Sequence, residues 1–162
     1  HVGIIGANGV GKSTLLKLVA GELLPRTDIR AAYMAQDYGD QLLGGQTPVD
    51  ILAPSGHKDD ITRARNLLGS MKYKTEEMEH PASDLSGGQR AKLLFLAMVL
   101  RGANVLLLDE PTRNFSPLSA PVIREVLAQF PGCIISVSHD RKYLEEVCTR
   151  VLELTPDGLR EA

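Results

Sequence analysis

Residues 6–13 read Gly-Ala-Asn-Gly-Val-Gly-Lys-Ser, which is a complete phosphate-loop motif of the form G-x-x-x-x-G-K-[ST]. Apolar residues precede the motif, and an apolar helical pattern follows it from Leu15. The glycines of such a loop let backbone N–H groups surround a polyphosphate, and the following helix N-terminus adds partial positive charge. Strand, loop and helix together predict a nucleoside triphosphate site rather than an ordinary glycine-rich turn.

The side chains of this motif have separate predicted tasks. Lys12 is expected to reach the β- and γ-phosphates, and the Ser13 hydroxyl is expected to ligate Mg²⁺. The residues predicted to contact the nucleotide here are Asn8, Gly9, Val10, Gly11, Lys12, Ser13 and Thr14.

A second candidate group follows the apolar run at 105–108, where Asp109 and Glu110 stand next to each other. A buried strand that ends in carboxylates places them at the C-terminal edge of a sheet, beside the phosphate loop. We predict that Asp109 holds Mg²⁺ directly or through water, and that Glu110 orients or deprotonates the attacking water. The alternative is a solvated acidic pair at a strand end.

A third candidate group, Leu85-Ser86-Gly87-Gly88-Gln89, precedes an apolar helical pattern. Ser86 with Gln89 three residues later forms a capping box, which would simply begin the helix. Two glycines in a first helical turn each weaken it by about 1 kcal/mol relative to alanine. That cost favours close approach of an anion to the helix start. Local physics leaves capping and phosphate contact equally open.

Composition limits the classes of protein to consider. A chain of 162 residues with 43% hydrophobic content is long enough for one domain with its own core. The net charge of −2 provides no global attraction to nucleic acid or to an anionic membrane. Neither a membrane span nor a signal peptide is visible, so we expect no direct membrane insertion and a cytoplasmic location. Cys133 and Cys148 have no C-x-x-C spacing and are predicted to be reduced, partly buried thiols.

The order of patterns along the chain predicts an α/β fold. Residues 2–36 indicate strand, loop, helix and strand, with the helix ending near Gly21. Residues 37–83 are rich in glycine and proline between short amphipathic stretches such as 61–68, which predicts a small helical subdomain inserted in the fold.

The last part of the chain, 84–162, returns to alternating helix and strand. Continuous apolar runs at 105–108 and 133–137 are typical of parallel strands buried on both faces, with a helix at about 118–130 between them. Pro156-Asp157-Gly158 predicts a hairpin within 151–160. The whole pattern predicts a mostly parallel sheet flanked by helices, with a small helical subdomain.

The string Leu-Ser-Gly-Gly-Gln, placed between a phosphate loop and a strand ending in Asp109-Glu110, resembles the signature of ATP-binding cassette (ABC) ATPases. The resemblance covers essentially the whole chain, as a single cassette over 1–162 that begins just after the family's N-terminal strands. It implies a P-loop NTPase fold and hydrolysis of Mg·ATP. It also implies a site shared by two cassettes, in which Ser86, Gly87, Gly88 and Gln89 of one cover the γ-phosphate bound to the other.

The resemblance also gives roles to two residues that would otherwise be unremarkable. Gln36 matches the glutamine that senses the metal ion and the nucleophilic water, and we count it with Ser13 and Asp109 as a metal residue. His139 matches the histidine that hydrogen-bonds the γ-phosphate. A lone strand-end glutamine or histidine would ordinarily be structural or exposed.

The segment Ser138-His139-Asp140-Arg141, followed by Tyr143-Leu144, resembles ABC-F proteins, which carry two cassettes on one chain and act on ribosomes. Residues 37–40 and 47–52 resemble the same group. The span between Gln36 and Leu85 suits a second, C-terminal cassette. The implied partners are a second cassette, as a homodimer or tandem domain, and the ribosome or RNA. The alternative is the nucleotide-binding subunit of a membrane transporter, with a transporter membrane domain as its partner.

Two features depart from the ABC-F pattern: the D-loop after Thr112, and the strands that would carry an adenine-stacking aromatic residue. In the D-loop, Ser116 occupies the position of the usual aspartate, which links paired sites. Arg113 is interpreted as an exposed loop arginine, with a contact to phosphate or nucleic acid across a dimer as the alternative. The strands that carry an adenine-stacking aromatic residue do not precede the phosphate loop, so we expect weakened ATP binding.

Overall fold

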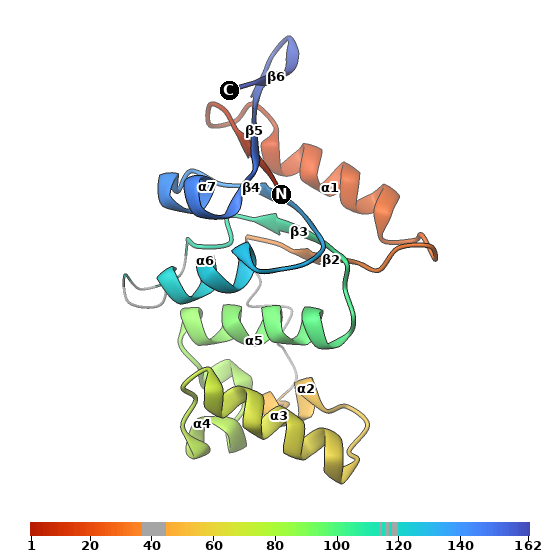
Figure 1. Cartoon of the computed structure of the whole chain (residues 1–162), viewed down its shortest axis with the longest axis vertical. Helices are drawn as coiled ribbons and strands as arrows, with labels where there is room; N and C mark the ends of the chain where they lie inside the picture. The colour runs from red at the N-terminus through yellow and green to blue at the C-terminus, as the bar shows by residue number, and fades with distance from the viewer. Residues whose placement is uncertain (37–44, 114, 116, 118–119) are drawn as a thin grey trace. The chain divides into compact units, whose positions relative to one another are not determined.

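The computed structural model describes residues 1–36, 45–113, 115, 117 and 120–162 (Figure 1). The chain divides into two compact units. We call His1–Gln36 together with Gly102–Ala162 the sheet unit, and Asp37–Arg101 the helical unit. Each unit is described by itself below.

The sheet unit contains a sheet with the strand order β2-β3-β4-β1-β5-β6, six strands within the described residues. All neighbours from β2 to β5 pair in parallel, and β6 pairs antiparallel with β5. This arrangement confirms the mostly parallel sheet and the C-terminal hairpin. The strands are β1 Val2–Ile5, β2 Ala31–Met34, β3 Val105–Asp109, β4 Cys133–Val137, β5 Arg150–Thr155 and β6 Gly158–Glu161.

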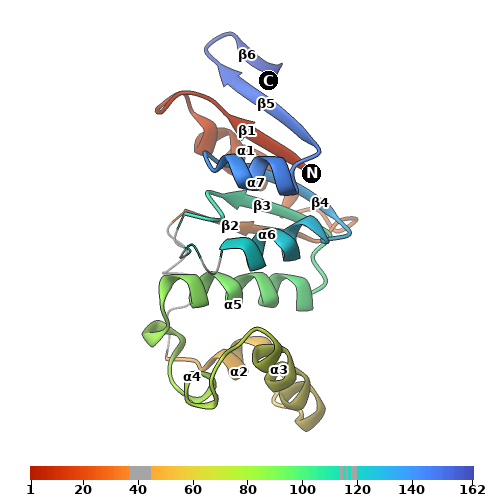
Figure 2. The same ribbon diagram turned by 60° about the vertical axis from the view of Figure 1, so that its left-hand side comes forward.

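Helices cover both faces of this sheet. Helix α1 (Lys12–Leu23) lies on one face, whereas α6 (Ala120–Ala128) and α7 (Arg141–Val147) lie side by side on the other (Figures 1 and 2). The predicted helix at 118–130 therefore exists, although residues 118 and 119 lie outside the described part of the chain. Helix α1 continues past Gly21 because Leu23 and Leu24 keep helical backbone geometry.

The core between α1 and the sheet explains why these strands are continuous apolar runs. Ile4, Leu16, Ala20, Leu107 and Val137 form one cluster, each at most 4% exposed. Burial of a large aliphatic side chain contributes roughly 1.5–3 kcal/mol. Because helices cover both faces, the four successive β3 residues Leu106–Asp109 are all buried, and the strand end is held on a rigid platform.

The helical unit is all-helical in its described part, as predicted for the insertion. Helix α2 contacts α3, α4 and α5. The unit extends to Arg101, whereas the prediction ended it at residue 83, because α5 packs against α2. Residues 37–40, which entered the comparison with ABC-F proteins, lie outside the described residues. The helices are α2 Pro48–Leu52, α3 Lys58–Ser70, α4 Thr75–Glu79, the 3₁₀ turn η2 Ala82–Asp84 and α5 Gly87–Leu100.

The two cysteines differ in exposure. Cys148, at the end of α7, is partly buried as predicted, and burial raises the pKa of its thiol. Cys133 is exposed, so the prediction was wrong there, because the residue lies at the solvent end of β4. Among the described helices, none has the length and apolarity needed to cross a membrane.

Candidate nucleotide site

A cavity of about 680 Å³ opens within the sheet unit, beyond the C-terminal ends of its central parallel strands. Open α/β sheets bind their ligands at this edge. Most of the residues predicted for the phosphate loop and the strand ends line it, whereas Val10 does not. The lining residues are Asn8, Gly9, Gly11, Lys12, Ser13, Thr14, Gln36, Asp109, Glu110, Arg113, Val137 and His139.

The start of α1 faces this cavity without a side-chain cap. Gly11 occupies the N-cap position with φ 104°, a left-handed conformation that side chains other than glycine rarely tolerate. The first turn of α1 contains no acidic residue. The exposed amides of the helix start therefore attract an anion. Gly6 is restricted in another way, because an added Cβ would lie 2.5 Å from the Leu154 carbonyl oxygen.

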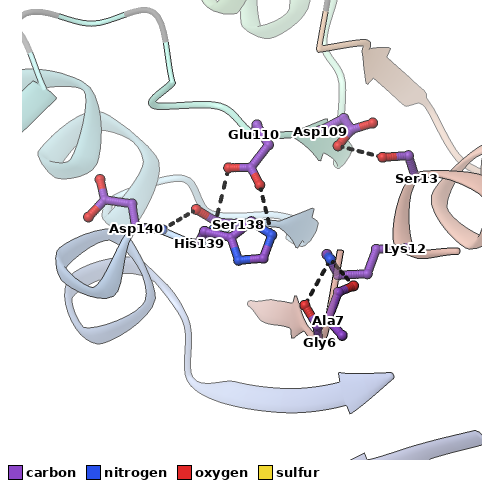
Figure 3. Close-up of polar contacts among 9 residues, drawn as sticks. All are labelled: Gly6, Ala7, Lys12, Ser13, Asp109, Glu110, Ser138, His139 and Asp140. Carbon is purple, nitrogen blue, oxygen red and sulfur yellow. Dashed lines mark hydrogen bonds and ion pairs between the residues drawn. The ribbon is translucent and has the colours of Figure 1, made fainter. Parts of the chain in front are cut away.

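Lys12 is the cation of the loop, and its side chain is only 7% exposed. Its Nζ donates to the carbonyl oxygens of Gly6 and Ala7, each at 2.9 Å (Figure 3). A lysine ammonium has three donors. These two hydrogen bonds hold the ammonium within the loop and leave a third N–H for an anionic oxygen in the cavity.

Ser13 and Asp109 are in contact at the cavity, although β1, which leads into the phosphate loop, and β3, which ends at Asp109, are not neighbouring strands. Strand β4 lies between β1 and β3, but α1 carries the Ser13 hydroxyl across to donate to Asp109 Oδ1 at 3.2 Å (Figure 3). Asp109 is 2% exposed. A hydroxyl and a carboxylate are hard oxygen ligands, so this pair fits Mg²⁺. Among the described residues, no group of three or more His, Cys, Asp or Glu side chains is arranged to hold a metal ion.

Glu110 leaves the strand in an unusual conformation. Its φ is 51°, and such a conformation costs a non-glycine residue about 1–3 kcal/mol. Two backbone hydrogen bonds impose it: the Glu110 N–H donates to the Val137 carbonyl at 2.9 Å, and the Glu110 carbonyl accepts from the Arg113 N–H at 3.1 Å. The chain thus turns sharply at Glu110, which lines the cavity beside the buried Asp109.

His139 lies opposite Glu110 at the end of β4. Its Nε2 is 3.7 Å from Glu110 Oε1, and its backbone N–H donates to Glu110 Oε2 at 3.4 Å (Figure 3). The imidazole is half exposed, whereas the Glu110 side chain is 17% exposed. The structure therefore brings together the two residues that were predicted to act at the terminal phosphate.

Asp140 joins the loops that carry Glu110 and His139, a role that the sequence interpretation missed. Its Oδ2 accepts from the Thr112 hydroxyl at 2.9 Å, and its Oδ1 accepts from the Lys142 and Tyr143 N–H groups as the N-cap of α7. The Asp140 N–H also donates to the Ser138 hydroxyl at 3.1 Å (Figure 3). An aspartate immediately before a helical pattern was the available signal.

The remaining predicted residues are placed as follows. Gln36 lines the cavity two residues beyond the end of β2. Ser86 and Gln89 belong to the helical unit and form the predicted capping box at the start of α5, where Gly87 and Gly88 make the first turn. Residues 114 and 116, and with them the D-loop departure, lie outside the described residues.

The capping box is complete. Gln89 Oε1 accepts from the Ser86 N–H at 3.0 Å and from the Ser86 hydroxyl at 2.9 Å, and Ser86 Oγ accepts from the Gln89 N–H at 3.3 Å. The Gln89 carbonyl in turn accepts a hydrogen bond from the Tyr73 hydroxyl. Burial raises the pKa of Tyr73 well above its usual value, so this donor stays protonated.

Residues 1–113 match the ABC transporter family. The probable ATP-binding protein YbiT of Escherichia coli O157:H7 is 33% identical to the chain over 162 residues, covering 95% of this chain and 31% of that protein. ABC transporter F family member 2 of Arabidopsis thaliana is 31% identical over 168 residues, covering 99% of this chain and 25% of that protein. The chain thus spans between a quarter and a third of these relatives.

Solved structures give the same fold. The dimeric structure of a post-hydrolysis state of the ATP-binding cassette MJ0796 bound to ADP and Pi superposes with a TM-score of 0.77 at 17% identity, covering 99% of this chain and 84% of that one. A second dimeric structure of MJ0796, a bacterial ABC transporter cassette, gives 0.76 at 18% identity, covering 94% and 80%. This likeness confirms the P-loop NTPase fold of the chain.

Proposed function

This chain belongs to the ABC transporter family, and from that membership we propose that it binds Mg·ATP in the sheet unit and hydrolyses it at a site shared with a second cassette. One observation carries the proposal. A single cavity collects Lys12, Asp109, Glu110 and His139 from segments that are far apart in the sequence. Phosphoryl transfer needs little covalent chemistry from the protein, because positioning and charge stabilisation do most of the catalysis.

Binding uses the loop and the start of α1. The uncapped amides of α1 and the third N–H of Lys12 bind the β- and γ-phosphates. Ser13 and Asp109 hold Mg²⁺, with Gln36 facing the same cavity. When bound, the ion neutralises charge on the phosphate oxygens.

Hydrolysis uses the pair at the other strand ends. Glu110 orients a water and accepts its proton as the water oxygen bonds to the terminal phosphorus and the bond to the bridging oxygen breaks. The products are ADP and inorganic phosphate. His139 donates to an oxygen of the terminal phosphate, and its position beside Glu110 suits that task because both side chains then face the same atom.

The second cassette supplies the lid. In this proposal the start of α5 in one cassette, with Ser86, Gly87, Gly88 and Gln89, covers the γ-phosphate bound to the other. Ser86 is exposed at a helix N-terminus, and its hydroxyl would exchange its hydrogen bond to Gln89 Oε1 for one to the phosphate. The relatives named ABC transporter F family members support a protein of the ABC-F type. From the resemblance to ABC-F proteins we propose that it is soluble and cytoplasmic and that it acts on the ribosome.

Ribosome co-sedimentation tests the proposed role. We expect the intact Glu110→Gln protein to pellet with ribosomes in the presence of Mg·ATP and to remain in the supernatant with ADP, because ATP trapped unhydrolysed holds the paired cassettes closed. The Lys12→Ala protein is the control and should not pellet with either nucleotide. Co-purification with a membrane-embedded subunit, without ribosome binding, would instead support the transporter alternative.

A further inference from the structure

Arg113 is a lining residue of the nucleotide cavity that no part of the proposed mechanism uses. It follows Asp109 by four residues and shares the cavity with Lys12 and Glu110. Its side chain is exposed, and within the described part of the chain no ion pair or side-chain hydrogen bond engages its guanidinium. An arginine in this position presents five N–H donors to whatever occupies the cavity.

The backbone of Arg113 is fixed relative to Glu110. The Arg113 N–H donates to the Glu110 carbonyl at 3.1 Å and closes a turn, in which the ring of Pro111 restricts φ. Thr112, which lies between Glu110 and Arg113 in the turn, is 7% exposed, and its hydroxyl donates a hydrogen bond to Asp140. The turn therefore anchors the base of the arginine side chain beside the residue proposed to orient the attacking water.

The charges around the cavity show why a second cation matters. The lining side chains include two carboxylates, Asp109 and Glu110, and two cations, Lys12 and Arg113. Arg113 adds a second cation beside these carboxylates and so lowers the repulsion between Glu110 and a Mg·triphosphate, which itself carries net negative charge. A guanidinium also matches two phosphate oxygens at once, which an ammonium does not.

We propose that the Arg113 guanidinium binds the terminal phosphate of a nucleoside triphosphate held in the cavity of the same chain, and thereby distinguishes triphosphate from diphosphate. The inference rests on the proposed function and adds a specificity residue to it. The terminal phosphate is the target because Arg113 is held next to Glu110, which is proposed to orient the water that attacks the terminal phosphorus. The contact is made within one chain, not across a pair of cassettes.

Binding measurements on the intact protein test this assignment. The dissociation constants for a non-hydrolysable ATP analogue and for ADP, both with Mg²⁺, would be measured by calorimetry for the unmodified protein and for Arg113→Ala and Arg113→Lys. We expect Arg113→Ala to weaken triphosphate binding about tenfold and Arg113→Lys about threefold, since lysine keeps the charge but not the paired donors. ADP affinity should stay within about twofold, because ADP lacks the contacted phosphate.

Arg63→Ala is the matched control, since Arg63 is an exposed arginine on α3 that does not line the cavity. It should bind both nucleotides as the unmodified protein does. An equal loss of ATP-analogue and ADP affinity in Arg113→Ala would overturn the inference, and so would unchanged affinity for both, the result expected if Arg113 contacts nucleic acid or a partner protein. Nucleotide binding that survives Lys12→Ala unaltered would refute the proposed function itself, whatever Arg113 does.

Discussion

Two helices of this chain begin at glycine-containing motifs, and their first turns are organised in opposite ways. At the start of α1, Gly11 is the N-cap and offers no side chain to the first amides. At the start of α5, Ser86 and Gln89 satisfy each other's backbone donors in a capping box. A helix start without side-chain acceptors, which we call open, leaves its amides available to an anion. A helix start with a capping box, which we call closed, uses its own side chains to stabilise the first turn.

This comparison shows that a phosphate displaces different hydrogen bonds at the two helix starts. A phosphate at α1 takes up donors that lack a side-chain acceptor. A phosphate at α5 must compete with the Gln89 carboxamide for the Ser86 hydroxyl, which donates to it at 2.9 Å. We therefore expect α1 to dominate nucleotide binding by a single chain, and α5 to contribute only when a second cassette closes over it.

The largest expected effect tests the open site. Lys12→Ala should weaken Mg·ATP binding by about a hundredfold or more, because a buried ammonium that is hydrogen-bonded to the loop and gives phosphate a charge-assisted donor contributes several kcal/mol. Calorimetric titration measures it. Lys17→Ala, an exposed lysine on the same helix, is the control and should bind normally. Unchanged Mg·ATP affinity in Lys12→Ala would contradict the claim that the start of α1 dominates nucleotide binding.

Glu110→Gln should separate binding from turnover. We expect ATP hydrolysis to slow at least about tenfold while ATP affinity is kept, since an amide fills the same space but cannot accept a proton. A steady-state phosphate-release assay on the paired protein measures the rate. Glu145→Gln on α7 is an exposed acidic control that should hydrolyse ATP at the normal rate. Unchanged turnover in Glu110→Gln would remove that residue from the catalytic role.

Asp140→Ala should affect both stability and catalysis. The change removes the N-cap of α7 and the acceptor of Thr112, which should lower the free energy of unfolding by about 1–2 kcal/mol. ATP turnover should fall as well, because the hydrogen bond between Thr112 and Asp140 no longer joins the loops that carry Glu110 and His139. Asp140→Asn keeps an acceptor for the α7 amides and should recover most of the stability in a urea titration. Full activity in Asp140→Ala would show that the tether has no part in positioning.

Ser86→Ala tests the closed helix start and should have the smallest effect. Loss of the cap should lower the free energy of unfolding by about 1 kcal/mol and leave ATP binding by a single chain unchanged. Ser83→Ala is the control, since its hydroxyl bonds only the neighbouring Asp84 among the described residues and should change neither property. A clear loss of ATP affinity in Ser86→Ala without a second cassette would break the distinction between the two helix starts.

Local patterns predicted most of the fold. The phosphate loop, the buried strands, the helical insertion and the C-terminal hairpin all appear where composition and spacing placed them. The boundaries were less accurate. The helical unit reaches Arg101 because α5 packs against α2, and a contact between two segments of the chain leaves no mark in the sequence of either one.

The candidate site shows the same difference between local patterns and contacts made by distant segments. That most of the phosphate loop and the pair 109–110 line one cavity was predictable, because each motif is continuous and its neighbours fix its backbone. The tether from Thr112 to Asp140 and the place of Arg113 were not. Arg113 is exposed as predicted, but its own segment did not indicate that it lines the same cavity as Lys12 and Glu110, and the alternative placed its phosphate contact across a dimer.

The sequence by itself determined the open start of α1, because a helix cap depends on only a few consecutive residues and on their allowed φ values. Only the tertiary structure decided that Ser13 reaches Asp109 and that Glu110 lies beside His139. Those pairs depend on strand order, with β4 between β1 and β3, and on the helices that cross the sheet. Strand order results from burial of both faces by the whole chain, which no single segment encodes.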